Sequence, residues 1–248
     1  MCHTCHTLGF VPAQFCSAHC VTAAQGAHSV YHVPPGAPRS QGGVAPSSLV
    51  EGDTQTASVV QSGVDARRQG NHKLSMKVLR RGRSAASGAL DRAILGYELA
   101  LTMQTMKSHR REAAQLFSTV AGEFEHIGAM SAWALSLARA FLLLAATRNS
   151  ARDCPLWWNE SALWDASLRA CRAEPASPLV WDMRGTVLCG GNSLLWNVTT
   201  PRTAHELRLA SLCFMRAAHL YADDEARKSA SERALFAHDA SHEVGRSS

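Results

Sequence analysis

Cysteine and histidine side chains, the usual protein ligands of zinc, are concentrated at the start of this chain. They form the string C-x2-C-x10-C-x3-C-x7-H-x3-H, made by Cys2, Cys5, Cys16, Cys20, His28 and His32. Structural zinc sites draw their ligands from closely spaced pairs of this kind, because a short turn or one helical face aims both side chains at a single ion. The spacing therefore predicts a zinc-binding module over residues 1–32.

The second half of this string resembles the end of a MYND-type zinc finger, which reads Tyr-Cys-Ser-x2-Cys, seven residues, His, three residues and Cys. The matching positions here are Phe15, Cys16, Ser17, Cys20, His28 and His32. Histidine in place of the last cysteine is an exchange that zinc accepts, whereas Gln25 stands where the family has tryptophan. The resemblance implies zinc as the cofactor and protein partners, including short proline-containing peptides.

The front of this finger is incomplete, because the family has two Cys-x2-Cys knuckles and this chain has one. If Cys2 and Cys5 represent the first knuckle, the interleaved family pattern joins them to Cys16 and Cys20 in a four-cysteine site. If they represent the second knuckle, they join the two histidines instead. The ten-residue gap that follows Cys5 favours the first arrangement, and a truncated start of the sequence is a further explanation.

Two other interpretations of the cysteines stay open. Cys2 to His6 also fits C-x-x-C-H, the haem attachment motif, although no leader precedes it. In the second interpretation, the cysteines lie in a disordered tail and bind no metal or haem. A catalytic zinc is not indicated, because residues 1–32 contain no Asp or Glu that would serve as a general base. The absence of a secretory signal predicts an intracellular protein, cytoplasmic or nuclear, whose thiols are reduced.

Residues 33–72 are rich in Pro, Gly, Ser and Thr and contain no Phe, Trp or Tyr. Such a composition buries too little apolar surface to offset its ordering entropy and predicts a disordered linker. A basic segment, residues 73–86, follows it. Residues 67–83 carry seven positive charges and no negative one, namely Arg67, Arg68, Lys73, Lys77, Arg80, Arg81 and Arg83. This run is a bipartite nuclear-import signal, a phosphate-contacting segment or a solvated linker end.

The composition changes from about Ser87 onward. Residues 87–240 are dominated by Ala, Leu and Arg, have apolar side chains at three- and four-residue spacings, and are predicted to be α-helical. Residues 241–248 are predicted to be a disordered tail. Two segments repeat a pattern of small, aromatic and small or medium side chains on one helical face: Ala113, Phe117 and Val120, and Ala210, Phe214 and Ala217.

Together with Trp181-x3-Gly185 after Pro175, this pattern resembles the tetratricopeptide repeat, which reads Trp-x2-Leu-Gly, Ala-x3-Phe-x2-Ala and a proline. Arg184 stands where the leucine is expected, and Ala222 where the last proline is. The intervals from Ala113 to Leu163 and from Leu163 to Ala210 are 50 and 47 residues, which exceed the family period of about 34. The resemblance implies a mainly α, repeat-like domain of helical hairpins, and a plain helical bundle is the alternative.

The remaining features limit the function class. Gly128–Ala146 is long and apolar but is interrupted by Arg139, so we expect a buried helix and no membrane span. No phosphate-binding glycine loop, Gly-x-Ser-x-Gly elbow or His-Glu-x2-His motif occurs, so we do not expect an enzyme. The sequence favours a zinc-binding adaptor with a helical scaffold. The alternatives are a nuclear regulator that contacts nucleic acid through residues 67–83 and a helical enzyme of unrecognised type.

Overall fold

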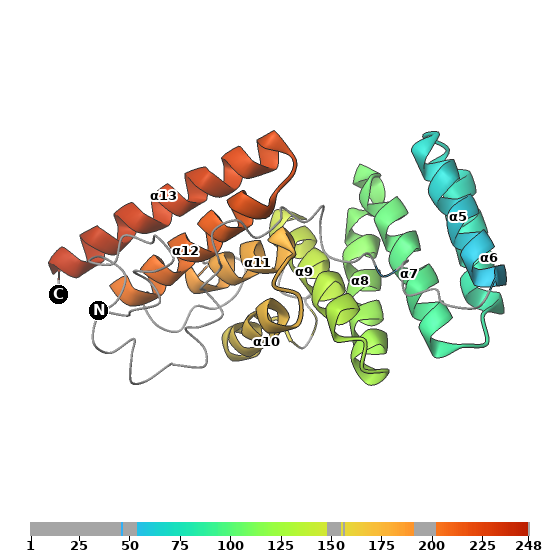
Figure 1. Ribbon diagram of the computed structural model, residues 1–248, viewed down its shortest axis with the longest axis horizontal. Coiled ribbons are helices and arrows are strands. Elements are labelled where there is room, and N and C mark those ends of the chain that lie inside the picture. Colours follow the sequence, from blue (N-terminus) through green and yellow to red (C-terminus); the bar gives the residue numbers. More distant parts are fainter. Residues whose placement is uncertain (1–45, 47–53, 148–154, 156, 191–201, 248) are drawn as a thin grey trace. The chain divides into compact units, whose positions relative to one another are not determined.

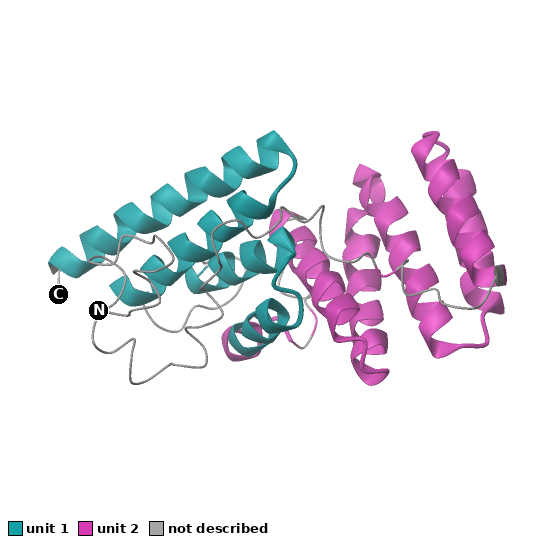
Figure 2. Ribbon diagram, in the orientation of Figure 1, with its two compact units in different colours: residues 1–42, 164–191, 198–248 teal, residues 43–163, 192–197 magenta. Residues whose placement is uncertain are grey.

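A computed structural model of the chain describes residues 46, 54–147, 155, 157–190 and 202–247. These residues are mainly helical and contain no β-strand, which confirms the predicted mainly α class. The described residues divide into two compact units, shown in Figure 2: unit 1 contains residues 164–190 and 202–247, and unit 2 contains residues 46, 54–147, 155 and 157–163.

Unit 2 is built from helices that pack against their neighbours in the sequence (Figure 1). They are α5 (Thr54–Arg68), α6 (His72–Ala85), α7 (Ala89–Gln104), the short 3-10 helix η3 (Lys107–His109), α8 (Arg110–His126) and α9 (Met130–Thr147). Glycines allow close approach between them. A Cβ on Gly63 of α5 would lie 2.7 Å from Leu79 of α6, and one on Gly96 of α7 would lie 2.7 Å from Val120 of α8.

Helix α5 corrects the prediction that residues 33–72 are a disordered linker, because residues 54–68 of that range are helical. The buried face of this helix consists of Thr56, Val60, Gly63 and Ala66, at helical spacing. These side chains are small, so the segment has few large apolar residues in its sequence. Small side chains still bury a face when the neighbouring helix supplies the bulk, which Leu79 of α6 does from a fully buried position.

Unit 1 contains most of α10 (Glu160–Ala173) together with α11 (Pro178–Leu188), α12 (Ala204–Leu220) and α13 (Asp224–Ser247). Helix α12 packs against α11 and α13. Its N-terminus is a capping box, in which the Thr203 hydroxyl accepts the Glu206 N–H and the Glu206 carboxylate accepts the Thr203 N–H. Trp181 is fully buried and donates its indole N–H to the Pro175 carbonyl at 2.8 Å.

The prediction of a disordered tail over residues 241–248 is wrong up to Ser247, where α13 ends. The buried face of α13 is formed by Ala230, Ala234, Ala237 and Ser241, so the helix packs against α12 with small side chains as far as Ser241. A hydrogen bond from the Ser211 hydroxyl of α12 to the Ala234 carbonyl, 2.8 Å long, adds to this contact. A buried face of alanine and serine contributes few large apolar residues to the sequence, and for this reason the sequence predicts a disordered tail over residues 241–248.

The small and aromatic positions singled out in the sequence lie in the cores of the two units. Ala113, Phe117 and Val120 are fully buried in unit 2, and Ala210, Phe214 and Ala217 are at most 3% exposed in unit 1. Gly185 allows α11 and α12 to meet, because a Cβ there would lie 2.7 Å from the Phe214 ring. A helical repeat and a plain bundle both predict this burial, so both interpretations remain open.

Candidate functional site

The six predicted zinc ligands, Cys2, Cys5, Cys16, Cys20, His28 and His32, lie outside the described residues. The zinc-binding module over residues 1–32 therefore stays a prediction. Within the ranges that the structure describes, no group of three or more His, Cys, Asp or Glu side chains converges to hold a metal ion. The features of the described residues that bear on function are the basic segment, the ion pairs Arg67–Glu98 and Asp182–Arg233, the cysteine thiols and the outer face of α13.

The seven charges of residues 67–83 are divided between two roles. Arg67 and Arg83 face their own unit, where they form ion pairs with Glu98 at 2.9 Å and with Glu123 at 2.7 Å. Arg68 is exposed and lies 3.8 Å from Asp65, one turn earlier in α5. The charge of the segment is therefore less available than its sequence suggests, because two of the seven cations are already paired across helices.

The four remaining cations, Lys73, Lys77, Arg80 and Arg81, are exposed and lie on one side of α6; we call them the basic face. None of them forms an ion pair or hydrogen bond with another described residue. Helix α6 contains no Asp or Glu. It begins at a cap in which the Asn71 side chain accepts the Leu74 N–H at 3.1 Å, so the charges stand on an ordered helix and not on a linker end.

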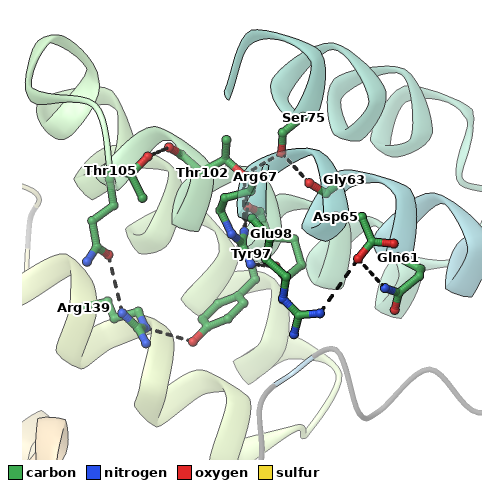
Figure 3. Close-up of polar contacts among 12 residues, drawn as sticks. Gln61, Gly63, Asp65, Arg67, Ser75, Tyr97, Glu98, Thr102, Thr105 and Arg139 are labelled. Atoms are coloured by element: carbon green, nitrogen blue, oxygen red, sulfur yellow. Dashed lines mark hydrogen bonds and ion pairs between the residues drawn. The ribbon is translucent and has the colours of Figure 1, made fainter. Parts of the chain in front are cut away.

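The Arg67–Glu98 pair belongs to a buried polar cluster that joins α5, α6 and α7 (Figure 3). Arg67 also donates to the Glu98 carbonyl at 3.1 Å and to the Thr102 hydroxyl at 3.3 Å. The Ser75 hydroxyl lies 3.0 Å from the Thr102 hydroxyl and donates to the Gly63 carbonyl at 2.8 Å. Because each polar group has a partner, the cluster fixes the arrangement of the three helices. Its chemistry is that of a structural network.

Unit 1 contains a buried carboxylate, Asp182, as unit 2 contains Glu98. Asp182 of α11 is 4% exposed and accepts two hydrogen bonds from Arg233 of α13, one of them 3.0 Å long, and one from the Tyr221 hydroxyl at 2.9 Å. Arg184, at the position where the repeat pattern expects leucine, donates to the Trp164 carbonyl at 2.8 Å and lies over the Trp164 ring. Asp182 has a counter-charge and Arg184 has hydrogen-bond partners, so both side chains serve packing. Sequence reasoning missed the Asp182–Arg233 pair.

Three cysteines lie within the described part of unit 1, and none forms a disulfide. Burial raises the pKa of the Cys171 thiol to about 12 and that of Cys189 to about 11, partly offset by nearby arginines. Burial also raises the pKa of Cys213 well above its ordinary value. A nucleophilic or metal-binding cysteine needs the thiolate form, so these thiols behave as small apolar side chains.

The outer face of α13 exposes two adjacent large apolar side chains, Leu235 at 64% and Phe236 at 72%. Asp223, Asp224 and Glu225 precede them at the start of α13, and the Asp223 carboxylate accepts the Ala226 N–H at 2.8 Å and so caps the helix.

Among the described helices, none combines the length and apolar character needed to cross a lipid bilayer. In α9, Arg139 instead donates to the buried Tyr97 hydroxyl at 2.9 Å.

The fold and these features define a class: a mainly α protein of packed consecutive helices that contains ion pairs between helices and whose α6 presents a basic face. Comparison of the chain with protein-family models, with curated proteins and with solved structures gives no match.

Proposed function

We propose that this protein is an intracellular adaptor, in which residues 1–32 bind zinc and the helical units bind protein partners. The observation that carries the proposal is the ligand string of Cys2, Cys5, Cys16, Cys20, His28 and His32. Four-coordinate structural zinc takes four cysteine ligands or a mixture of cysteine and histidine, and both sets can be drawn from this string. Zinc would fold the segment around itself, since small modules of this kind obtain their folding free energy from the metal.

Two further observations support binding in place of catalysis. Three buried charged side chains of the described residues, Glu98, Asp182 and Arg184, have hydrogen-bond partners on neighbouring helices, as a structural role requires. The exposed Leu235 and Phe236 offer apolar surface of the kind that protein partners cover. The resemblance of residues 15–32 to a MYND-type finger suggests short proline-containing peptides as one class of partner.

Zinc content of the purified full chain tests this proposal. We expect about one zinc per chain, and we expect the Cys5→Ser variant to lose it, because Cys5 is a ligand in both arrangements of the string and a tetrahedral structural site needs all four ligands. Cys189→Ser is the matched control, since this half-buried thiol lies in unit 1 and outside the ligand string. A zinc content near zero in the wild type, or equal zinc in the wild type and in Cys5→Ser, refutes the proposal.

A second candidate, favoured by the basic face of α6, is contact with nucleic acid. Lys73, Lys77, Arg80 and Arg81 are exposed on one side of an ordered helix and have no acidic neighbour within it. If all four neutralise phosphates of duplex DNA, the logarithm of the association constant falls with the logarithm of salt concentration with a slope of about −3.6.

Fluorescence anisotropy with a labelled duplex, measured at several salt concentrations, gives this slope. The variant Lys77→Glu/Arg80→Glu should abolish binding. The control Lys228→Glu/Arg246→Glu changes the net charge equally but on α13, and should bind as the wild type does. A slope near zero, or equal loss in both variants, argues against nucleic acid as the partner of the basic face.

A further inference from the structure

Helix α13 carries two histidines that meet on its surface. His238 and His242 are four residues apart, a spacing that places both on one side of a helix. Their rings lie with centroids 4.7 Å apart, and their Nε2 atoms are 3.2 Å apart. The two Nε2 atoms face one another, and His242 is exposed while His238 is half-buried, so the pair lies at the surface of the helix.

The separation of the two nitrogens matches that of two ligands on one metal ion. Zinc–histidine bonds are about 2.0–2.1 Å long, so nitrogens 3.2 Å apart subtend an angle of about 100° at a shared ion. That angle lies between the square-planar and tetrahedral values. In the absence of metal, one neutral imidazole donates to the other through the same two atoms. Metal binding uses the same two atoms, and it requires the rings to turn so that both lone pairs face the ion and the donor ring to carry its proton on Nδ1.

The backbone that presents the pair is held by packing. Ala237 and Ser241 are fully buried against the rest of unit 1, and the Ser241 hydroxyl donates to the His238 carbonyl at 2.6 Å. The turn between the two histidines is therefore fixed by the residues that precede each of them in the sequence. A pre-formed turn makes the second metal–nitrogen bond intramolecular, which raises the affinity well above that of a single imidazole.

We propose that His238 and His242 form a surface site for a divalent transition-metal ion, in which water fills the remaining coordination positions. Imidazole nitrogen suits copper, nickel and zinc, and the expected order of affinity is copper above nickel, with zinc below copper. The site is separate from the ligand string of residues 1–32 and goes beyond the proposed function. It supplies two protein ligands and not three, in keeping with the lack of any larger ligand cluster among the described residues.

The site has a consequence for α13 itself. This helix packs through Ala230, Ala234, Ala237 and Ser241, small side chains that bury little area each. A metal ion that bridges residues 238 and 242 binds the helical conformation and not the unfolded one, so it stabilises the C-terminal half of α13 by mass action. We therefore expect metal to slow amide hydrogen exchange around residues 238–246.

The test is a titration of the isotopically labelled full chain, produced without a histidine tag, with nickel chloride. Paramagnetic nickel should broaden the NMR amide signals around residues 238–242, and the His242→Ala variant should raise the half-saturating concentration about a hundredfold. His205→Ala is the matched control, because this exposed histidine of α12 has no histidine four residues away. It should leave the titration at α13 unchanged.

A second variant, His242→Ala/Glu243→His, keeps the number of histidines and moves one of them off the shared face. We expect it to lose affinity as His242→Ala does. Equal half-saturation at α13 in the wild type and His242→Ala, or full affinity in the displaced variant, overturns the proposal. Cys5→Ser should not alter nickel binding at α13, so the outcome is independent of whether residues 1–32 bind zinc.

Discussion

A close contact between helices α11 and α12 gives a prediction whose magnitude follows from the structure. Gly185 of α11 lies against Phe214 of α12, and a Cβ built on the glycine meets three carbons of the ring at 2.7, 2.8 and 2.9 Å. Phe214 is 3% exposed, and the Arg233 guanidinium lies over its ring. The ring is therefore enclosed and has no open space into which it can move. Gly185→Ala must push α11 and α12 apart or distort the ring.

Overpacking a core by a methyl group costs about 1–3 kcal/mol, while replacing glycine by alanine inside a helix returns up to about 1 kcal/mol. We expect Gly185→Ala to lower the free energy of unfolding by about 1–2 kcal/mol. Gly122→Ala is the control, because Gly122 lies inside α8 and a Cβ there has no atom within 4 Å. Only the propensity gain remains, so that variant should be more stable than the wild type by up to about 1 kcal/mol.

Urea unfolding followed by tryptophan fluorescence measures both variants, and Trp181, four residues before Gly185, reports on the affected contact. The double variant Gly185→Ala/Phe214→Leu completes a cycle in which we expect a coupling energy of about 1 kcal/mol, because the smaller side chain makes room for the methyl group. If Gly185→Ala is as stabilising as Gly122→Ala, α11 and α12 do not meet at this glycine and the reasoning is refuted.

Three further perturbations test the buried groups, each by urea unfolding. Arg67→Met leaves the buried carboxylate of Glu98 without its counter-charge and should cost about 3 kcal/mol; the double variant with Glu98→Met should recover most of this. Asp182→Asn weakens the bidentate contact with Arg233 and should cost about 2 kcal/mol, and a neutral result argues against that contact. Because burial raises the pKa of the Cys171 thiol from 9.0 to about 12, the unfolded chain loses this proton first. The Cys171 thiol should therefore lower the free energy of unfolding between pH 9 and 12 by up to about 1.4 kcal/mol per pH unit, and Cys171→Ala should remove that share of the slope and leave the part due to Cys189 and Cys213.

Much of the helical architecture can be predicted from the sequence, because the core residues of these helices are large or regularly spaced. Phe117 and Phe214, each flanked by small residues at helical spacing, were predicted to face a core and are buried. Helix α5 was missed, because its buried face of Thr56, Val60, Gly63 and Ala66 depends on bulk supplied by α6. Such small side chains produce no apolar periodicity in the sequence, and only the packing of α6 against them shows that they are buried.

The charged features were predictable only in part. The run of cations over residues 67–83 is plain in the sequence, but its division into paired and exposed charges is not. Arg67 meets Glu98, 31 residues later, and Arg233 meets Asp182, 51 residues earlier. Contacts at such separations are set by how the helices pack, which local patterns do not encode. The zinc ligands of residues 1–32 lie outside the described residues and stay a prediction from spacing.

X-ray absorption at the zinc edge of the purified full chain tests the central claim, zinc binding by residues 1–32, most directly. Zinc–sulfur bonds of about 2.3 Å and zinc–nitrogen bonds of about 2.0–2.1 Å are readily distinguished. Our account predicts one tightly bound zinc with four sulfur ligands, or with two sulfur and two nitrogen ligands, and the same spectrum in His242→Ala. A zinc shell of nitrogen and oxygen alone, or no tightly bound zinc, would contradict it.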